Sequence, residues 1–520
     1  MRKNFGSRIL LFTVTAGILT NICTAADETS SYQEGLRPNI VLILADDMGY
    51  GDISLLNEKS KIRTPHLDSL GREGIVFTDA HAACSICGPS RYGILTGRYP
   101  MRNRRKASNN PNGFGPPVIE PNRLTIAQIL KNKGYDTAAF GKWHLGMTWP
   151  TRDGKPLTDT NSETEWPRID YTRRIADGPT DRGFDYYFGI PASLDMVPYV
   201  FIENDHVTEI PTTVKQNDPP RPGPAGKDFE PIDVLPALTR QTVEFINNHG
   251  IAGPQQGKPF FVYMPLNAPH TPLVPTRSWQ GKNELGDYGD FVLQVDDAVG
   301  QVLAAVDRNG LSENTLVIFT VDNGFAPYLK PEKYESQGHF PSHIYRGYKG
   351  DIYDGGHRLP FLVRWPGKVK PGTCSDELVC LTDFARTFAE ITDYQIPEDA
   401  AEDSISFLPL LSGKEHPQKR TSAVHLSGKN RVSFREGNWK LIVSANTSPR
   451  TPQRKQSPPC ELYDIEKDPS EQNNLAEEKP EIVESMFVTL QTILQDGRST
   501  PGKPQKNDSD FTLQPLENTP

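Results

Sequence analysis

The chain has 520 residues, of which 36% are hydrophobic and 23% are charged. A chain of this length can bury one large core and still form a second, smaller domain. The formal net charge of -9 at pH 7 excludes a general nucleic-acid binder, because such proteins need excess basic residues to displace phosphate counterions.

The N-terminus has the layout of a secretory signal peptide. Basic residues precede an apolar run at 9–22, and Thr24, Ala25 and Ala26 offer small residues for cleavage. We therefore expect residues 1–26 to be removed and the chain to be exported, either to the periplasm or into the medium. A membrane anchor is the alternative, but the run is short and interrupted by polar residues, and no other run could span a bilayer.

Six short, nearly continuous apolar segments predict buried strands, and they alternate with segments of helical period. This alternation predicts an α/β fold with a parallel or mixed sheet flanked by helices. The predicted strands are 39–45, 75–77, 137–140, 259–264, 316–321 and 359–364. The predicted helices of this part are 65–73, 89–97, 125–133, 291–306 and 383–391.

The first predicted strand ends in Asp46 and Asp47. Adjacent carboxylates after a buried strand repel each other unless a cation or a turn accommodates them. Ligands of α/β proteins also bind at the carboxyl ends of such strands. The alternative is a solvated turn in which an aspartate caps the next helix.

The segment 84–98 begins with the sequence C-S-I-C-G-P-S-R. Proline suits the first helical position, so we expect Cys87 to lie just before a helix that starts at Pro89, where free amides favour an anion. Arg91, in the first turn, can fold back onto that anion. A buried structural cysteine is one alternative. Cys84 and Cys87 also form a C-x-x-C pair, but no second pair completes a zinc site, and a redox dithiol does not need the Pro-Ser-Arg that follows.

Four basic residues follow this segment: Arg102, Arg104, Arg105 and Lys106. Such a run is usually solvated, but so near the predicted nucleophile it is also a candidate contact for a polyanionic substrate. The stretches 147–180 and 193–224 are polar or rich in proline, and we expect surface excursions there, which is where specificity tends to reside.

Later segments deliver further polar side chains. Lys142 and His144 follow the strand at 137–140, and two residues apart in an extended segment they point to the same side. A structural histidine beside a tryptophan is the alternative for His144. Prolines on both sides of His270 stiffen its loop.

Asp322 and Asn323 follow the strand at 316–321, and Lys349 follows a polar loop. In the helix at 291–306 the apolar period predicts that Asp296 and Asp297 lie on the exposed face and are not ligands.

The pattern changes beyond residue 400. Shorter strands at 431–443 and 461–464 and a helix at 480–495 predict a small second domain at 401–497. The tail at 498–520 is polar and contains proline, so we expect it to be disordered.

Cysteine pairing cannot be deduced from the sequence. Export would permit disulfides among four of the six cysteines. These four are Cys84, Cys374, Cys380 and Cys460.

A parallel sheet brings the ends of its strands together, so these polar clusters are expected to converge. Asp46, Asp47, Asp322 and Asn323 offer only oxygen atoms, which suits Ca²⁺ or Mg²⁺ and not Zn²⁺. Around such an ion, positive and proton-transferring groups can hold a tetrahedral oxyanion. Those groups are Arg91, Lys142, His144, His270 and Lys349.

The sequence C-G-P-S-R at 87–91 followed by L-T-G-R at 95–98 resembles the signature of type I sulfatases. The resemblance extends over 39–52, 64–98, 141–146, 269–272, 322–324, 349–367, 462–464 and 468–469. It implies an alkaline-phosphatase-like α/β domain at 36–400, with a mixed sheet flanked by helices. It also implies a smaller C-terminal α+β domain that contains an antiparallel sheet. Gly88 departs from the serine or threonine that members often carry there.

The resemblance implies that a maturation enzyme oxidises Cys87 to formylglycine. It further implies one Ca²⁺ per chain, with Mg²⁺ as the alternative, bound by Asp46, Asp47, Asp322, Asn323 and the formylglycine at position 87.

The implied reaction is hydrolysis of a sulfuric ester through a sulfo-enzyme intermediate. One hydroxyl of the hydrated aldehyde attacks sulfur while His270 protonates the leaving alcohol and Lys142 and Lys349 hold the sulfate oxygens. His144 then takes the proton of the second hydroxyl and sulfate leaves, while Arg91 orients the hydrate.

The expected substrate is a sulfated carbohydrate or an aryl sulfate, with a 6-O-sulfated hexosamine or galactose as the sugar. Two other functions stay open from the sequence. One is a phosphodiesterase or phosphonate hydrolase of the same superfamily, and the other is an inactive protein that binds sulfated glycans.

Overall fold

The computed structural model describes residues 37–103, 112–160, 163–217, 221–251, 258–412, 419–446 and 460–516. The predicted signal peptide at 1–26 lies outside these residues. None of the helices in the described ranges is both long and apolar enough to cross a membrane.

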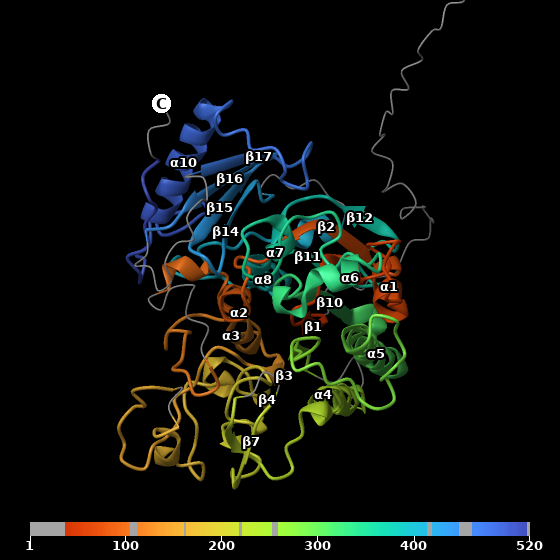
Figure 1. Ribbon diagram of the computed structural model, residues 1–520. Coiled ribbons are helices and arrows are strands. Elements are labelled where there is room, and N and C mark those ends of the chain that lie inside the picture. The colour runs from red at the N-terminus through yellow and green to blue at the C-terminus, as the bar shows by residue number, and fades with distance from the viewer. Residues whose placement is uncertain are drawn as a thin grey trace, which may run out of the picture.

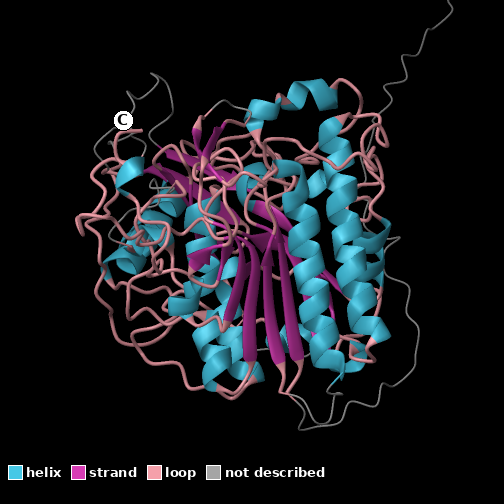
Figure 2. Cartoon of the chain, turned by 90° about the horizontal axis from the view of Figure 1, so that it is seen from below, coloured by secondary structure: helices cyan, strands magenta, loops and turns pink. Residues whose placement is uncertain are grey.

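An 11-stranded mixed sheet runs through the molecule, and helices pack on both sides of it (Figures 1 and 2). At its centre, β1 pairs in parallel with β10 on one side and β9 on the other. In spatial order its strands are β12 (Thr373–Ser375), β2 (Ile75–His81), β11 (Arg358–Arg364), β10 (Thr315–Val321), β1 (Asn39–Ala45), β9 (Phe260–Pro265), β3 (Asp136–Lys142), β4 (Tyr186–Ile190), β5 (Ile202–Glu203) and β6 (His206–Val207), while β13 (Val379–Cys380) also pairs with β2. All six predicted strands of this part are confirmed.

The helices are α1 (Pro65–Arg72), α2 (Cys87–Thr96), α3 (Ile126–Asn132), α4 (Val234–Ile251), α5 (Asp287–Arg308), α6 (Pro331–Glu335), α7 (Asp354–His357), α8 (Phe384–Ile391), α9 (Leu408–Leu411) and α10 (Pro480–Gln495). The predicted helices correspond to α1, α2, α3, α5, α8 and α10, whereas α4 was not predicted. A short hairpin of β7 (Thr213–Lys215) and β8 (Gly223–Ala225) lies in one of the predicted excursions.

The expectation that Asp296 lies on the exposed face of α5 is wrong. Asp296 is buried, and its carboxylate accepts the backbone N–H groups of His66 and Leu67 at 3.2 and 2.8 Å. It thereby satisfies free amides at the start of α1, which a helix cannot satisfy internally. The periodicity of one helix does not reveal such a contact with another.

A second sheet follows the first along the chain, and it is fully antiparallel. It contains β14 (Ser422–Leu426), β15 (Arg431–Glu436), β16 (Trp439–Ser444) and β17 (Cys460–Asp464) in that order, and α10 packs against it (Figure 1). The two sheets lie on either side of residue 400, where the sequence predicts the domain boundary.

The prediction that residues 498–520 are disordered is wrong for residues 498–516. Asp508 Oδ2 lies 2.7 Å from Nη1 of the buried Arg98, and Leu513 forms a β-bridge with Ala445. A polar segment is held in place here because a buried guanidinium needs an acceptor. Residues 517–520 lie outside the described part.

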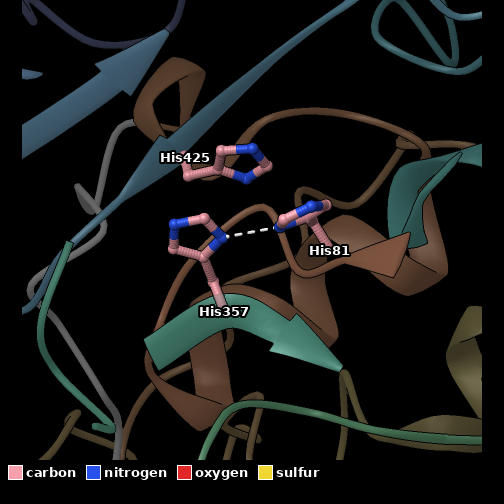
Figure 3. Close-up of side chains that lie close together, drawn as sticks. All are labelled: His81, His357 and His425. Carbon is pink, nitrogen blue, oxygen red and sulfur yellow. Dashed lines mark hydrogen bonds between the residues drawn. The ribbon is translucent and has the colours of Figure 1, made fainter. Parts of the chain in front are cut away.

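Three buried histidines join the two sheets: His81 from β2, His357 from α7 and His425 from β14 (Figure 3). Nδ1 of His81 lies 3.0 Å from Nδ1 of His357, and His425 Nδ1 donates to the carbonyl of Ala82 at 2.8 Å. The rings of His357 and His425 stack at 4.2 Å with 13° between their planes. The three residues offer ligand nitrogens that lie within 4.8 Å of one another, and their side chains link the large sheet to the antiparallel sheet.

None of the five cysteines in the described ranges forms a disulfide. Cys374 is exposed, whereas Cys84, Cys87 and Cys380 are buried.

Arg102 does not face a substrate, which corrects its candidate role. It is buried, and its Nε and Nη2 donate to Asp403 Oδ2 and Oδ1 at 2.7 and 2.8 Å. The backbone N–H of Tyr99 donates to the same carboxylate at 2.7 Å. This bidentate pair ties the segment after α2 to residue 403. The other three basic residues of the run lie outside the described part.

We expect Asp403→Asn to destabilise the protein strongly, by about 3–5 kcal/mol, because Arg102 would stay buried without its charge partner. Asp153→Asn is the matched control, since its pair with Arg168 is exposed to solvent and screened by it, so that its loss should change the stability little. Urea or thermal denaturation of both variants measures the difference. Equal effects of the two substitutions would contradict this account.

The stabilising effect of the Arg102–Asp403 pair depends on pH. Burial alone would raise the pKa of Asp403, but Arg102 holds it below the ordinary value. Stability from the pair is therefore present above the ordinary aspartate pKa of about 4 and is lost as the pH falls through the lower folded-state value. The difference in the free energy of unfolding between wild type and Asp403→Asn should therefore become smaller in that acid range.

Candidate active site

The central strands bring the predicted oxygen ligands to one edge of the large sheet. β1 and β10 run in register, with Ala45 opposite Val321, so the residues after both strands emerge together. The N–H of Asp322 donates to Ala45 O at 3.1 Å, and the N–H of Asp47 donates to Asp322 Oδ1 at 3.4 Å. Together with Asp46, this places three fully buried carboxyl groups side by side.

Cys87 faces these carboxyl groups from the start of α2. Its Sγ lies 3.5 Å from Asp46 Oδ1 and 3.8 Å from Asp47 Oδ1. Burial and the neighbouring charge of Asp322 raise the pKa of the thiol well above its ordinary value. Because the thiolate is the reactive form, these surroundings argue against an unmodified cysteine as nucleophile or redox group.

The start of α2 differs from the prediction by two residues. Cys87 is the first helical residue, after the extended Ile86, and Pro89 is the third. Proline fits there because the first N–H groups of a helix have no partner within it. Cys87 thus lies inside the first turn, and Arg91 lies in the second.

Arg91 is fully buried and connects three strand ends. Its Nη2 and Nε donate to Asp322 Oδ2 at 2.8 and 3.1 Å, and its Nη1 donates to the carbonyl of Lys142 at 3.0 Å. Nη2 also lies 3.5 Å from Asp46 Oδ2. Burial would lower the pKa of this guanidinium, but the two carboxylates raise it. Arg91 therefore remains charged.

Two lysines neutralise the adjacent aspartates. Nζ of Lys142 donates to Asp46 Oδ2, and Nζ of Lys349 donates to Asp47 Oδ2 at 2.7 Å. Burial would raise the pKa of each carboxyl group. The lysine beside each one holds the pKa of Asp46 well below its usual range and that of Asp47 below it.

Asp322 behaves differently from the other two. Burial and the charge of Asp46 raise its pKa to about 7, although Arg91 opposes this rise. The cations of the chain therefore do not fully compensate three carboxylates in this space. A further positive charge would favour the ionised form of Asp322.

Asn323 provides the fourth predicted oxygen. Its Nδ2 donates to Asp47 Oδ1 at 2.7 Å and to the carbonyl of Gly324 at 3.0 Å. Its Oδ1 is buried and accepts no hydrogen bond from the described residues. A buried, unpartnered carbonyl oxygen beside three carboxyl groups fits a hard divalent cation such as Ca²⁺ or Mg²⁺.

His144 is buried, and neither of its ring nitrogens has a partner among the described residues. Its backbone φ is 57°, and that of Asp47 is 63°, a left-handed conformation that is unfavourable for residues with a Cβ. Unpartnered polar atoms and a strained backbone cluster at functional sites. Burial and the charge of Lys142 lower the pKa of His144 well below its usual range, so the ring is neutral.

His270 completes the inner cluster. Its Nδ1 donates to the carbonyl of Thr271 at 2.7 Å, and its Nε2 lies 3.5 Å from Asp47 Oδ2. One ring nitrogen of His270 lies within 4.8 Å of a carboxylate oxygen of Asp46, a carboxylate oxygen of Asp47 and the Sγ of Cys87. Burial lowers the pKa of His270, and Asp47 only partly opposes this.

The sequence analysis missed Tyr328, which follows β10 in the short turn Pro327–Leu329. Its hydroxyl donates to Asp47 Oδ2 at 2.7 Å and lies 3.3 Å from His270 Nε2. The loop has no periodicity, and a tyrosine in it carries no recognisable signal. Only the path of the loop reveals this contact.

The structure thus brings all ten predicted site residues together, nine of them buried and Lys349 partly exposed. They are Asp46, Asp47, Cys87, Arg91, Lys142, His144, His270, Asp322, Asn323 and Lys349.

The family model Sulfatase matches residues 38–394, and the model N-sulphoglucosamine sulphohydrolase, C-terminal, matches residues 348–498. An N-acetylgalactosamine-6-O-sulfatase of Bacteroides thetaiotaomicron is 33% identical over 94% of this chain and 99% of that protein. Human arylsulfatase A is 30% identical over 86% of each protein.

The fold agrees with these matches. A solved structure from Bacteroides thetaiotaomicron, described with the metabolism of multiple glycosaminoglycans, is similar with a TM-score of 0.76. It is 32% identical and covers 88% of this chain and 99% of that one. The chain has the alkaline-phosphatase-like fold of these neighbours, and it belongs to the type I sulfatase family.

Proposed function

We propose that this sulfatase removes 6-O-sulfate from N-acetylhexosamine units of glycosaminoglycans, with N-acetylgalactosamine 6-sulfate as the preferred unit. The observation that carries the reaction type is Cys87, which faces buried carboxyl groups and two lysines at the start of a helix. The similarity of nearly the whole chain to an N-acetylgalactosamine-6-O-sulfatase supports the sugar and the position.

The nucleophile of this proposal is formylglycine, made from Cys87 by a maturation enzyme. Its hydrated aldehyde supplies two hydroxyls on one carbon, so that one can displace the sugar from sulfur and the other can release sulfate. The raised pKa of the Cys87 thiol supports this modification, because the unmodified side chain is a weak nucleophile.

Asp46, Asp47, Asp322, Asn323 and the modified residue 87 would hold a divalent cation, for which Ca²⁺ fits the oxygen donors. That ion supplies positive charge for the nucleophile and for the sulfate oxygens.

The chain itself supplies the remaining groups. Lys142 and Lys349 place ammonium groups beside the carboxylates, where they attract and orient a sulfate. His270 donates a proton to the leaving sugar oxygen, and the neutral His144 accepts one when sulfate leaves. Arg91 donates two hydrogen bonds to Asp322 and would orient the modified residue.

We also propose that the chain acts in the periplasm or outside the cell. The leader pattern at 1–26 supports export, and sulfated polymers are found outside the cytoplasm.

A substrate panel tests the proposed function. Wild-type enzyme should release sulfate fastest from N-acetylgalactosamine 6-sulfate, more slowly from N-acetylglucosamine 6-sulfate, and hardly at all from 4-O-sulfated units. Ion chromatography of released sulfate measures these rates. A matched aryl sulfate and aryl phosphodiester pair tests the reaction type, and strong preference for the diester would overturn the proposal.

Cys87→Ser should stop after one turnover. Serine can be sulfated by the substrate, but it has no second hydroxyl to expel sulfate, so the ester should persist. Mass spectrometry of the peptide that contains residue 87 detects both the ester in this variant and formylglycine in the wild type. Cys84→Ser is the control and should keep conversion and turnover. Steady sulfate release by Cys87→Ser would contradict the mechanism.

Removal of divalent ions by a chelator should abolish turnover, because the positive charge that the ion would supply to the nucleophile and to the sulfate oxygens is then lost. Addition of Ca²⁺ should restore activity, whereas Zn²⁺ should not, since the site offers oxygen donors. Asp47→Asn should lower the Ca²⁺ content of the purified protein, as measured by elemental analysis. Full turnover after complete chelation would rule out a metal role.

A further inference from the structure

We infer that Tyr328 is a substrate-facing residue of this site, whose hydroxyl positions His270 and whose ring forms a wall against the leaving sugar. The inference rests on the proposed function and extends it to a side chain outside the predicted set. The hydroxyl and the ring of the tyrosine therefore have separate roles.

The hydroxyl has a defined hydrogen-bonding direction. Asp47 is an ionised carboxylate and can only accept, so the Tyr328 proton points to Asp47 Oδ2, 2.7 Å away. Towards His270 the phenol oxygen can therefore only accept. A histidine that donates a proton to substrate carries hydrogen on Nε2, and Tyr328 Oη lies 3.3 Å from that atom. Nδ1 is already fixed by the carbonyl of Thr271 at 2.7 Å. In the doubly protonated form that gives a proton to the substrate, the ring of His270 is thus held at both nitrogens.

The ring of Tyr328 points outwards. Half of the residue is exposed to solvent, while the aspartate and the histidine that its hydroxyl contacts are buried. Its centroid lies 6.1 Å from that of His270, in an edge arrangement, and 5.7 Å from Lys349 Nζ. A large aromatic surface beside the acid and a sulfate-attracting lysine is a suitable contact for the apolar face of a sugar ring.

The loop that carries Tyr328 is anchored on both sides. Phe325 is buried and packs edge-on against Tyr288 and Tyr334, with centroids 5.0 and 5.5 Å apart. Its carbonyl accepts the backbone N–H of Lys349 at 2.9 Å. Pro327 fixes the backbone before the tyrosine. Tyr328 is therefore presented in one orientation, which a positioning residue requires.

Two substitutions separate the two ends of the side chain. Tyr328→Phe keeps the ring and should lower kcat for N-acetylgalactosamine 6-sulfate on the order of 10-fold, below the roughly 100-fold or more that a general acid contributes. Its KM should stay within about twofold, because the sugar contact is kept. Tyr328→Leu should lower kcat similarly and also raise KM about 5-fold or more, since the aromatic surface is lost.

Equilibrium binding gives a readout that does not depend on turnover. In a Cys87→Ala background, which cannot form the nucleophile, Tyr328→Leu should weaken calorimetric binding of the 6-sulfated sugar about 5-fold. Tyr328→Phe should leave that affinity unchanged. Tyr186→Phe is the matched control, because the Tyr186 hydroxyl also donates to a carboxylate, Glu203, at 2.8 Å and its contacts lie outside the site.

The outcomes are distinguishable. If the wild type releases no sulfate from any sugar, the proposed function fails. If the wild type is active and both Tyr328 variants match it, the inference fails. Equal loss of kcat in both variants, with unchanged KM and a lowered melting temperature, would show that Tyr328 is only structural and would also overturn the inference.

Discussion

Three carboxyl groups are buried together at the ends of two neighbouring strands, and the surrounding structure depends on the charges that compensate them. Two unit charges about 4 Å apart interact by roughly 4 kcal/mol at the effective dielectric constant of a protein. Repulsion among Asp46, Asp47 and Asp322 would thus consume much of the stability of a domain if it were not balanced. Arg91, Lys142 and Lys349 provide that balance by direct hydrogen bonds, and each comes from a different segment. Burial and the charge of Asp46 raise the pKa of Asp322 to about 7, so a further cation would favour its ionised form.

The two domains cooperate to hold this cluster. Backbone groups of the C-terminal domain reach the loop before Cys87, where the N–H of Ser85 donates to Leu426 O at 2.9 Å. The N–H of Gly350, next to Lys349, donates to Ser85 O at 2.8 Å, and the N–H of Gly428 donates to Gly350 O at 3.1 Å. The antiparallel sheet therefore holds the segments that carry Cys87 and Lys349 relative to each other.

Sequence reasoning succeeded where one strand and its end determine the outcome. The run from Asn39 to Ala45 could only be a buried strand, and the carboxylates that follow it had to lie at the sheet edge. It failed where contact with a segment far away in the sequence determines whether a side chain is buried. Asp296 was predicted to face solvent because the periodicity of its own helix carries no information about the free amides at the start of α1. Arg102 looked like part of a solvated basic run because its partner, Asp403, lies about three hundred residues away. In both cases the missing information was a long-range hydrogen bond to a buried charge, which no local pattern encodes.

The same distinction separates the inner and outer parts of the active site. The inner part is constrained by buried charge, so few residue types are tolerated there and the sequence signal is strong. The outer part is formed by loops, where a side chain such as Tyr328 can be half exposed and still contact a buried carboxylate. The charges that make a sulfatase recognisable from its sequence lie in the inner part, whereas the position of an outer side chain such as Tyr328 depends on the path of its loop.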